Sequence, residues 1–251
     1  MAQTVFSRYE KKYLMTEEIY NKLRERLADH MQTDQYGVHT ICNIYYDTDN
    51  YELIRRSIEK PVYKEKLRLR SYGIPDLNST VYLEIKKKYQ KVVNKRRIAL
   101  TLQEAYDFVE KGIHPQEQSQ IIDEIDFFLK RYTLHRGIYL AYDREALFEK
   151  ENPSFRVTFD HNIRSRQTDM GLENGDDGTL LLSPEYYLME SKIMGATPLW
   201  FTEILSEYKI YPVSFSKYGN IYKSNFNAFN PDEMMIHRIQ NWEELRRKKI
   251  C

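Results

Sequence analysis

Charged and apolar residues alternate along the segment 63–98, which has the most regular pattern in the chain. Because alternate residues of a β-strand lie on the same face, this pattern predicts antiparallel strands with one charged and one apolar face. The apolar face would contain residues such as Leu67 and Leu69 and would need a cover. The charged face would consist of Lys64, Lys66, Arg68, Arg70, Glu84, Lys86, Lys88, Lys95 and Arg97.

The charged face has two interpretations. An antiparallel sheet often exposes a polar face to water, so these residues could form an ordinary solvated surface. Like charges directly opposite each other across strands repel, however, and few acids dilute them here. If the sheet closed so that this face pointed inward, the cations would line a positively charged bore suited to a polyanion.

The segments before and after this sheet predict further alternating elements. A strand at 5–15 is followed by a helix from Thr16 to about residue 30, a strand at 38–47 and a short helix at 48–58, capped by Thr48 or Asp49. After the charged strands, a helix begins at Thr101 with Glu104 in the spacing of a capping box and ends at Gly112. A second amphipathic helix is predicted over 117–133.

The second half predicts more strands whose charged residues share a face. They cover 137–147 with Arg144, 154–166 with Arg156, and the end of 180–195 with Glu190 and Lys192. A loop at 167–180 and a helix at 200–208 separate them, Lys217 lies in an aromatic-rich turn, and a helix at 231–250 is expected to pack outside.

Composition restricts the class of protein. The 251 residues fit one large domain, and a net charge of +1 means that any basic site is local. This balance argues against a general nucleic-acid-binding protein. Two cysteines suit a reducing compartment, and without a long apolar run or a signal peptide the expectation is a soluble cytoplasmic protein.

The ordered set of motifs resembles a known family. The sequence Arg8-Tyr9-Glu10-Lys11-Lys12 resembles the first strand of the CYTH, or triphosphate tunnel metalloenzyme, superfamily, with Arg8 where a Glu is usual. The later runs LEIKKK, NKRR, YDREAL, FRVTFD, LMESKIMG and SFSKYGNIY are similar to the VTC domain, the polyphosphate polymerase domain of the vacuolar transporter chaperone complex and its bacterial relatives.

This resemblance implies an α+β fold, an eight-stranded antiparallel β-barrel tunnel with helices outside. It implies transfer of the ATP γ-phosphate to a growing polyphosphate chain, with Mn²⁺ or Mg²⁺. The implied catalytic residues are Lys12, Arg68, Arg70, Lys86, Arg144, Arg156 and Lys217. Glu190 is the implied metal ligand, Glu10 is a further candidate, and the remaining predicted phosphate contacts are Arg8, Lys66, Lys88, Lys95, Arg97 and Lys192.

Alternatives stay open for single residues and for the activity. Lys192 could simply pair with Glu190, and Glu84 could assist a metal or pair with neighbouring lysines. The expected partners are ATP and inorganic polyphosphate or pyrophosphate, without nucleic acid, and a membrane-protein partner is left open. A tunnel triphosphatase, or a non-catalytic module that binds polyphosphate or inositol phosphates, are the alternatives to a polymerase.

Overall fold

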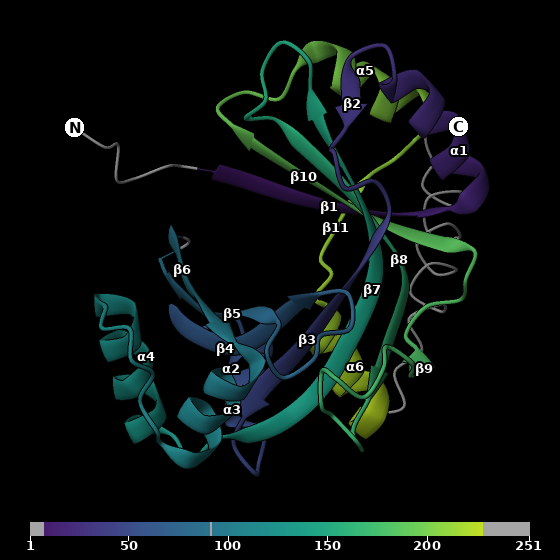
Figure 1. The fold of residues 1–251 in the computed structure, drawn as a ribbon. Helices are drawn as coiled ribbons and strands as arrows, with labels where there is room; N and C mark the ends of the chain where they lie inside the picture. Colours follow the sequence, from purple (N-terminus) through teal and green to yellow (C-terminus); the bar gives the residue numbers. More distant parts are fainter. Residues whose placement is uncertain (1–7, 91, 228–251) are drawn as a thin grey trace. The chain divides into compact units, whose positions relative to one another are not determined.

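A computed structural model describes residues 8–90 and 92–227. This part of the chain forms eleven strands and six helices, and it divides into two compact units. Unit 1 contains the described residues of 1–35, 146–162 and 180–251, and unit 2 contains 36–145 and 163–179. The predicted antiparallel sheet with packed helices is confirmed (Figure 1).

The elements follow the predicted order closely. The strands are β1 (Arg8–Thr16), β2 (Met31–Thr33), β3 (His39–Asp47), β4 (Tyr63–Tyr72), β5 (Thr80–Tyr89), β6 (Val92–Thr101), β7 (His135–Glu149), β8 (Arg156–Arg166), β9 (Thr179–Leu180), β10 (Tyr186–Met194) and β11 (Pro212–Val213). The helices are α1 (Glu17–Leu27), α2 (Glu52–Ile58), α3 (Leu102–Lys111), α4 (Gln120–Arg131), α5 (Leu199–Glu207) and α6 (Lys217–Asn227).

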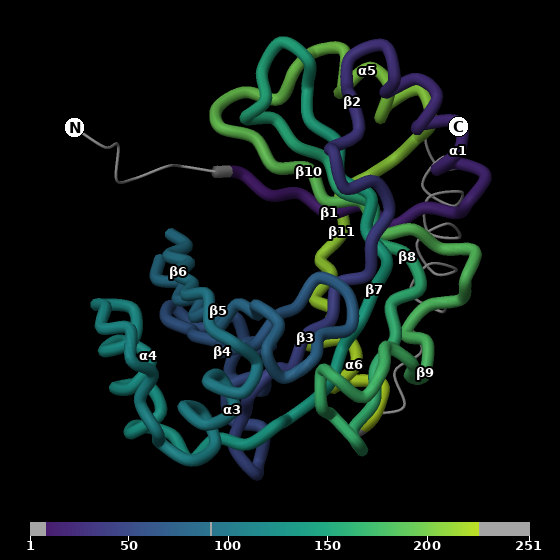
Figure 2. Tube along the Cα trace, in the orientation of Figure 1, coloured from purple at the N-terminus to yellow at the C-terminus, as the bar shows by residue number. Residues whose placement is uncertain are grey.

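Unit 2 is built on the strand order β7-β3-β4-β5-β6, in which β4, β5 and β6 follow one another as a meander (Figure 2). Leu67, Leu69, Leu83 and Ile85 point away from the charged residues and are fully buried. Helices α2, α3 and α4 cover this apolar face and complete its core (Figure 1). The strand periodicity therefore separates an apolar, helix-covered face from a charged one.

Helix α3 begins as predicted. The hydroxyl of Thr101 accepts a hydrogen bond from the backbone N–H of Glu104, whose carboxylate accepts one from the backbone N–H of Thr101. Gly112 ends the helix in the left-handed conformation at φ 71°, which glycine adopts without a steric penalty.

Helix α2 begins later than predicted. Its N-cap residue by position is Tyr51, which makes no side-chain capping bond, but the hydroxyl of Thr48, one of the two predicted caps, accepts a hydrogen bond from the N–H of Glu52 at 2.9 Å. The buried carboxylate of Asp47 accepts hydrogen bonds from the next two N–H groups, those of Leu53 and Ile54. An acid at the end of β3 thus accepts hydrogen bonds from backbone N–H groups of the first helical turn, which have no acceptor within the helix.

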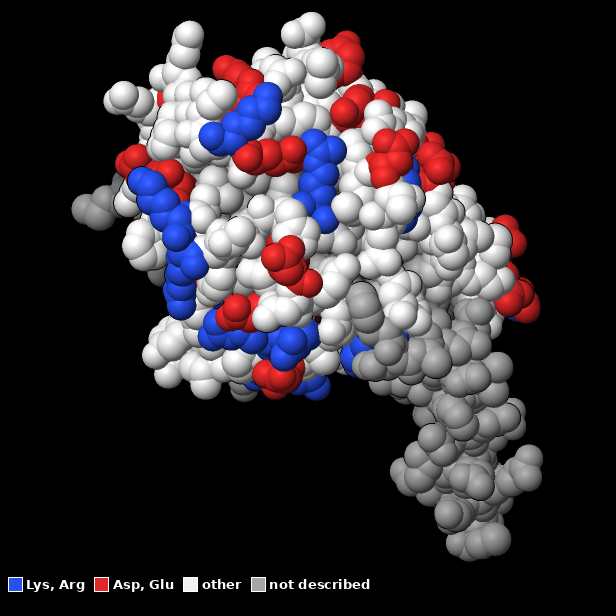
Figure 3. Space-filling view, turned by 90° about the horizontal axis from the view of Figure 1, so that it is seen from below, with Lys and Arg blue, Asp and Glu red and all other residues white. Residues whose placement is uncertain are grey.

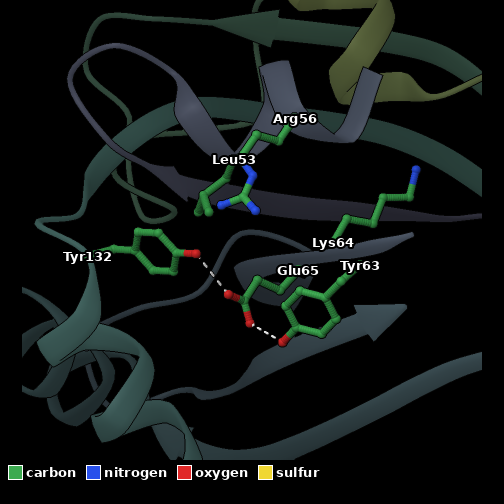
Figure 4. A pocket seen from close by; sticks show the side chains of 6 residues that line it. All are labelled: Leu53, Arg56, Tyr63, Lys64, Glu65 and Tyr132. Carbon is green, nitrogen blue, oxygen red and sulfur yellow. Dashed lines mark hydrogen bonds between the residues drawn. The ribbon is translucent and has the colours of Figure 1, made fainter. Parts of the chain in front are cut away.

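A buried carboxylate also ties β4 to the end of α4. Glu65 accepts hydrogen bonds from the hydroxyls of Tyr63 (2.6 Å) and Tyr132 (3.0 Å), and these residues line a small pocket with Lys64, Arg56 and Leu53 (Figure 4). Both oxygens of Glu65 are satisfied on the helix-covered side of β4. This acid therefore anchors the sheet and faces away from the cations of the same strand.

Unit 1 contains the strand order β11-β1-β10-β8, and β2 pairs with the end of β7. The odd-numbered residues of β1, such as Tyr13 and Met15, join Val157, Phe159 and Met189 in a buried core. Helices α1 and α5 contribute Leu23, Leu27, Phe201 and Ile204 to the same core. The even-numbered residues of β1 are thereby left on the opposite face.

The structure changes the prediction at the C-terminal side. Lys217 does not lie in a turn; it is the first residue of helix α6. The short strands β2, β9 and β11 had no signal in the sequence because two or three residues carry no period. The helix predicted at 231–250 lies outside the described residues. Within the described part, no helix is long and apolar enough to span a bilayer.

The capping box predicts a measurable contribution to stability. Replacing Thr101 by Ala should lower the free energy of unfolding by about 1 kcal/mol, because the N–H of Glu104 loses its acceptor. Urea unfolding followed by circular dichroism measures this change. Thr133→Ala, at an exposed loop position, should leave the unfolding midpoint nearly unchanged, and equal midpoints for the two variants would contradict the assignment.

Candidate functional site

In unit 2, the charged residues of β4, β5 and β6 lie in register on one face, which we call the cationic face. Arg68 is opposite Glu84, and Glu84 is opposite Arg97. The neighbouring rows are Lys66–Lys86–Lys95, Lys64–Lys88 and Arg70–Tyr82. The sequence prediction that these cations share a face is therefore confirmed for the placement of the residues, whereas their roles remain predictions.

The two arginines of β4 are held by neutral groups of β3 and β7. Arg68 donates to the hydroxyl of Tyr45 at 3.0 Å, and Arg70 donates to the side-chain oxygen of Asn43 at 3.0 Å and to the hydroxyl of Tyr142 at 3.2 Å. Fixed guanidinium groups lose less entropy on binding an anion than free ones. No pattern in the sequence identified these three partners, because they lie on strands other than β4.

Glu84 is the acid at the centre of the cationic face. Its side chain is only 1% exposed, and its two oxygens lie 2.5 Å from Nε of Arg68 and 2.7 Å from Nζ of Lys95. Burial alone would raise the pKa of Glu84, but the charges of Arg68, Arg70 and Lys95 outweigh it and lower the pKa to about 2. Glu84 therefore stays ionised beneath the cations, which project beyond it with 22% and 39% exposure for Arg68 and Lys95.

Two lysines of this face, Lys95 and Lys64, have a pKa below that of a free lysine side chain. Burial lowers the pKa of Lys95, Arg68 lowers it further, and Glu84 opposes them only in part, which leaves a pKa of about 8. Burial also lowers the pKa of Lys64, and the charges of Lys88 and Lys86 add to the effect. The face thus holds more positive charge than its own acids compensate, as a polyanion site requires.

Aromatic rings flank the arginines at the other end of the same face. The guanidinium of Arg97 lies 4.8 Å from the ring centre of Tyr82, and that of Arg144 lies 5.0 Å from the ring centre of Tyr142. Arg144 is in register with His39 of β3. The structure therefore places Arg144 next to the aromatic end of the cationic face.

Unit 1 carries a second charged face on β1, β10 and β8. The row Lys12–Glu190–Thr158 lies beside the row Glu10–Lys192–Arg156. Glu190 is buried, and its oxygens lie 3.2 Å from Nζ of Lys12, 3.2 Å from Nζ of Lys192 and 3.3 Å from Nζ of Lys217. Lys192 does pair with Glu190, as the simpler interpretation expected.

Lys217 reaches this face from the start of helix α6. Its ammonium group is buried and donates to the carboxylate of Asp160, a fully buried acid on β8, as well as to Glu190. Asp160 was not among the predicted site residues, although it lies on the same strand and face as Arg156. Asp160 and Arg156 are both even-numbered residues of one strand, and this alternation was the signal in the sequence that could have identified Asp160. The side chain of Arg8 lies outside the described part, and only its backbone pairing with Met194 is defined.

The acids of unit 1 fit a divalent cation that arrives with phosphate. Across residues 8–90 and 92–227, no point gathers three or more Asp, Glu, His or Cys side chains. Glu190 and Asp160 approach one ammonium group, and Glu10 lies 3.6 Å from Lys12. Mg²⁺ is commonly held by one or two carboxylates together with substrate phosphates, which matches this donor set.

One side of the molecule shows how charges are distributed outside these two faces. On the surface seen in Figure 3, basic and acidic side chains are interspersed, without a continuous area of one sign. Several of the charged helix residues pair within one turn, such as Lys22 with Glu18 and Lys111 with Asp107. This agrees with the net charge of +1 and with a local anion site.

Two solved structures define the class of fold. The chain is similar to a candidate adenylate cyclase from Bacillus halodurans, with 19% identity, a TM-score of 0.54, and coverage of 86% of this chain and 96% of the other. It is also similar to a candidate adenylyl cyclase from Hippeastrum with a dominant triphosphatase activity, at 16% identity, a TM-score of 0.53, and coverage of 86% and 95%. The chain shares its fold with these two proteins.

Residues 7–226 match the VTC domain family, so the chain belongs to that family. This confirms the resemblance drawn from the strand motifs. No curated protein matches the sequence significantly.

The surroundings of Glu84 generate a prediction about pH. Affinity for tripolyphosphate should fall as pH rises through about 8, because Lys95 loses its proton there. In Glu84→Gln the carboxylate that favours the charged form is gone, so the fall should move to lower pH by about one unit. Calorimetric titration with tripolyphosphate, without metal and over a pH series, measures this midpoint.

Glu124→Gln is the matched control for Glu84→Gln. Glu124 also pairs with two cations, Lys87 at 2.6 Å and Arg96 at 3.5 Å, but on the helix-covered side of the sheet. It should leave the pH midpoint of binding where it is in the wild-type protein. An unchanged midpoint in Glu84→Gln would show that Glu84 does not support the charge of Lys95.

Proposed function

We propose that this protein is a metal-dependent polyphosphate polymerase, which transfers the γ-phosphate of ATP to the end of an inorganic polyphosphate chain. The observation that carries the proposal is the length of the cationic face. From Arg70 to Lys64 the cations span six residue steps of strand, roughly 20 Å, and at the far end the ammonium of Lys64 donates to the carbonyl oxygen of Ser57 at 3.0 Å. A face of this length offers positive charge to a phosphate chain beyond the three phosphates of a nucleotide.

The chemistry needs positioning and charge neutralisation more than proton transfer. The terminal phosphate of a polyphosphate chain already carries an anionic oxygen, so it attacks without a general base. Arg68 and Arg70 would grip phosphate oxygens in the fork geometry that guanidinium groups favour. The row Lys66–Lys86–Lys95 would supply point charges to the neighbouring phosphates.

The charged face of unit 1, taken by itself, carries cations around a candidate metal ligand. Lys12, Lys192 and Lys217 surround Glu190, and exposed Arg156 follows Lys192 in register. A bound Mn²⁺ or Mg²⁺ would neutralise charge that develops on the phosphate oxygens. We propose Glu190 as its ligand, with Glu10 as a second, because both carry carboxylates next to lysines that phosphate would engage.

A tunnel triphosphatase is the alternative activity. The fold likeness to the Hippeastrum protein, which has a dominant triphosphatase activity, supports it. A non-catalytic module for polyphosphate or inositol phosphates is the other alternative, since the same cations would bind such ligands without turnover. The expected partners of the polymerase are ATP and polyphosphate or pyrophosphate.

Incubation with ATP and Mn²⁺, followed by gel separation of the products, tests the proposal. The wild-type protein should form acid-labile phosphate chains, and Arg68→Ala and Glu190→Ala should abolish them. Arg68 binds the transferred charge and Glu190 holds the metal, so each loss should be at least hundredfold, about 3 kcal/mol in the barrier. Release of free phosphate alone would favour the triphosphatase, and tight binding without turnover would favour the binding module.

Two neighbouring lysines of β5 that face opposite sides of the sheet allow a more specific test of the cationic face. Lys86 lies on the cationic face, whereas its neighbour Lys87 points to the other side and pairs with Glu124. Lys86→Ala should lower affinity for tripolyphosphate about tenfold, and Lys87→Ala should leave it within twofold, although both remove one charge from β5. Binding measured at low and high salt checks this, and equal losses would indicate a nonspecific charge effect.

A further inference from the structure

The aromatic end of the cationic face carries one exposed ring and two half-buried rings. Tyr72 is 51% exposed on β4, two residues beyond Arg70, and Tyr82 is directly opposite Arg70 on β5. The ring centres of Tyr72 and Tyr82 are 5.7 Å apart, and those of Tyr72 and His39 are 5.9 Å apart. These three residues, which we call the aromatic cluster, lie on the same side of the sheet as Arg68 and Arg70.

We propose that the aromatic cluster binds the base of a nucleoside triphosphate whose phosphates extend along β4 toward Arg70 and Arg68. This inference rests on the proposed function, because it assigns the nucleotide donor a direction on the same face. The base stacks on the exposed ring of Tyr72, beside Tyr82 and His39, and the terminal phosphate points toward the lysine rows.

The order of chemistry along the strands supports this orientation. Moving along β4 from its end, one meets Tyr72, then Arg70, then Arg68, then Lys66, in steps of two residues or roughly 7 Å. A nucleotide has the same order, with an aromatic base, an adjacent phosphate and then further phosphates. The reverse orientation would place a base, which carries no charge, among the lysines.

The geometry of the rings leaves a stacking surface available. Tyr72 and Tyr82 meet edge to face at 77°, so they do not cover each other by stacking. Nδ1 of His39 is 3.2 Å from the carbonyl oxygen of Gly37, which fixes the orientation of the imidazole. Stacking on such rings tolerates different bases, because every base has a π-face. The ligand class is therefore a nucleoside triphosphate without strict base specificity.

Other exposed apolar residues near the aromatic cluster suggest a second use of this surface, the binding of a protein partner. Val38, Ile74 and Leu77 are 71%, 55% and 45% exposed. No pattern of charges around these three apolar residues indicates a particular protein partner. The aromatic cluster, in contrast, lies next to Arg70 and Arg68 on one face. The charge complementarity to phosphate therefore favours a nucleotide over a protein partner, including a second copy of this chain.

Equilibrium binding of ATP and of tripolyphosphate to the same protein, both without metal, tests the proposal. The wild-type protein should bind ATP with an affinity to which the base contributes. Tyr72→Ala should lower the affinity for ATP roughly tenfold, as expected for the loss of one stacked base, and leave the affinity for tripolyphosphate within twofold. Tyr72→Phe keeps the ring and should bind ATP as the wild-type protein does.

Tyr89→Ala is the matched control, because Tyr89 is 55% exposed on β5 but has the opposite parity to Tyr82. It should change neither affinity. The proposal is overturned if Tyr72→Ala leaves ATP binding unchanged, if both affinities fall in parallel, or if the variant alters only the oligomeric state. Binding is measured without turnover, so the experiment tests whether the aromatic cluster binds the base even if the protein has no polymerase activity.

Discussion

The structure depends on buried carboxylates that separate crowded cations. In unit 2, Glu84 lies beneath Arg68, Arg70 and Lys95, and in unit 1, Glu190 lies among Lys12, Lys192 and Lys217. Without Glu84 between them in register, Arg68 and Arg97 would face each other as like charges that repel, and Lys95 of the neighbouring all-lysine row would lose its acid partner. A short Glu on a strand suits this place, because the longer Lys and Arg side chains extend past it toward a ligand.

The balance of these charges sets both stability and binding. The lowering of the Glu84 pKa from 4.5 to about 2 corresponds to about 3 kcal/mol of stability. A depressed acid contributes this above its unfolded pKa and loses it as pH falls toward 2. Lys95 acts in the opposite direction, since its lowered pKa means that folding disfavours its charge. Keeping Lys95 charged therefore has an electrostatic cost, which a bound anion would relieve.

The sequence predicted what depends on period two and on local capping. Alternation placed the cations of β4, β5 and β6 on one face, and the spacing of Thr101 and Glu104 placed a helix start. It could not find contacts between distant segments. Asp47 caps α2 from the end of a strand, and Tyr45 and Tyr142 accept hydrogen bonds from the arginines of β4. Lys217 donates to Asp160 from the start of α6, a segment whose aromatic residues led to the prediction of a turn.

The distribution of Lys and Arg along the cationic face follows from what each must do. The arginines lie where neutral partners such as Asn43 and Tyr45 can fix a planar fork, so in the proposed function they would define a position for particular phosphates. The lysines occupy the far rows, where their charge is compact and their stems are flexible, which suits phosphates that must move past them. A polymerase whose product grows by one phosphate at a time would need both a fixed end and a mobile path. The order of side chains along β4, from Tyr72 through the two arginines to Lys66, is the order that the proposed function would use.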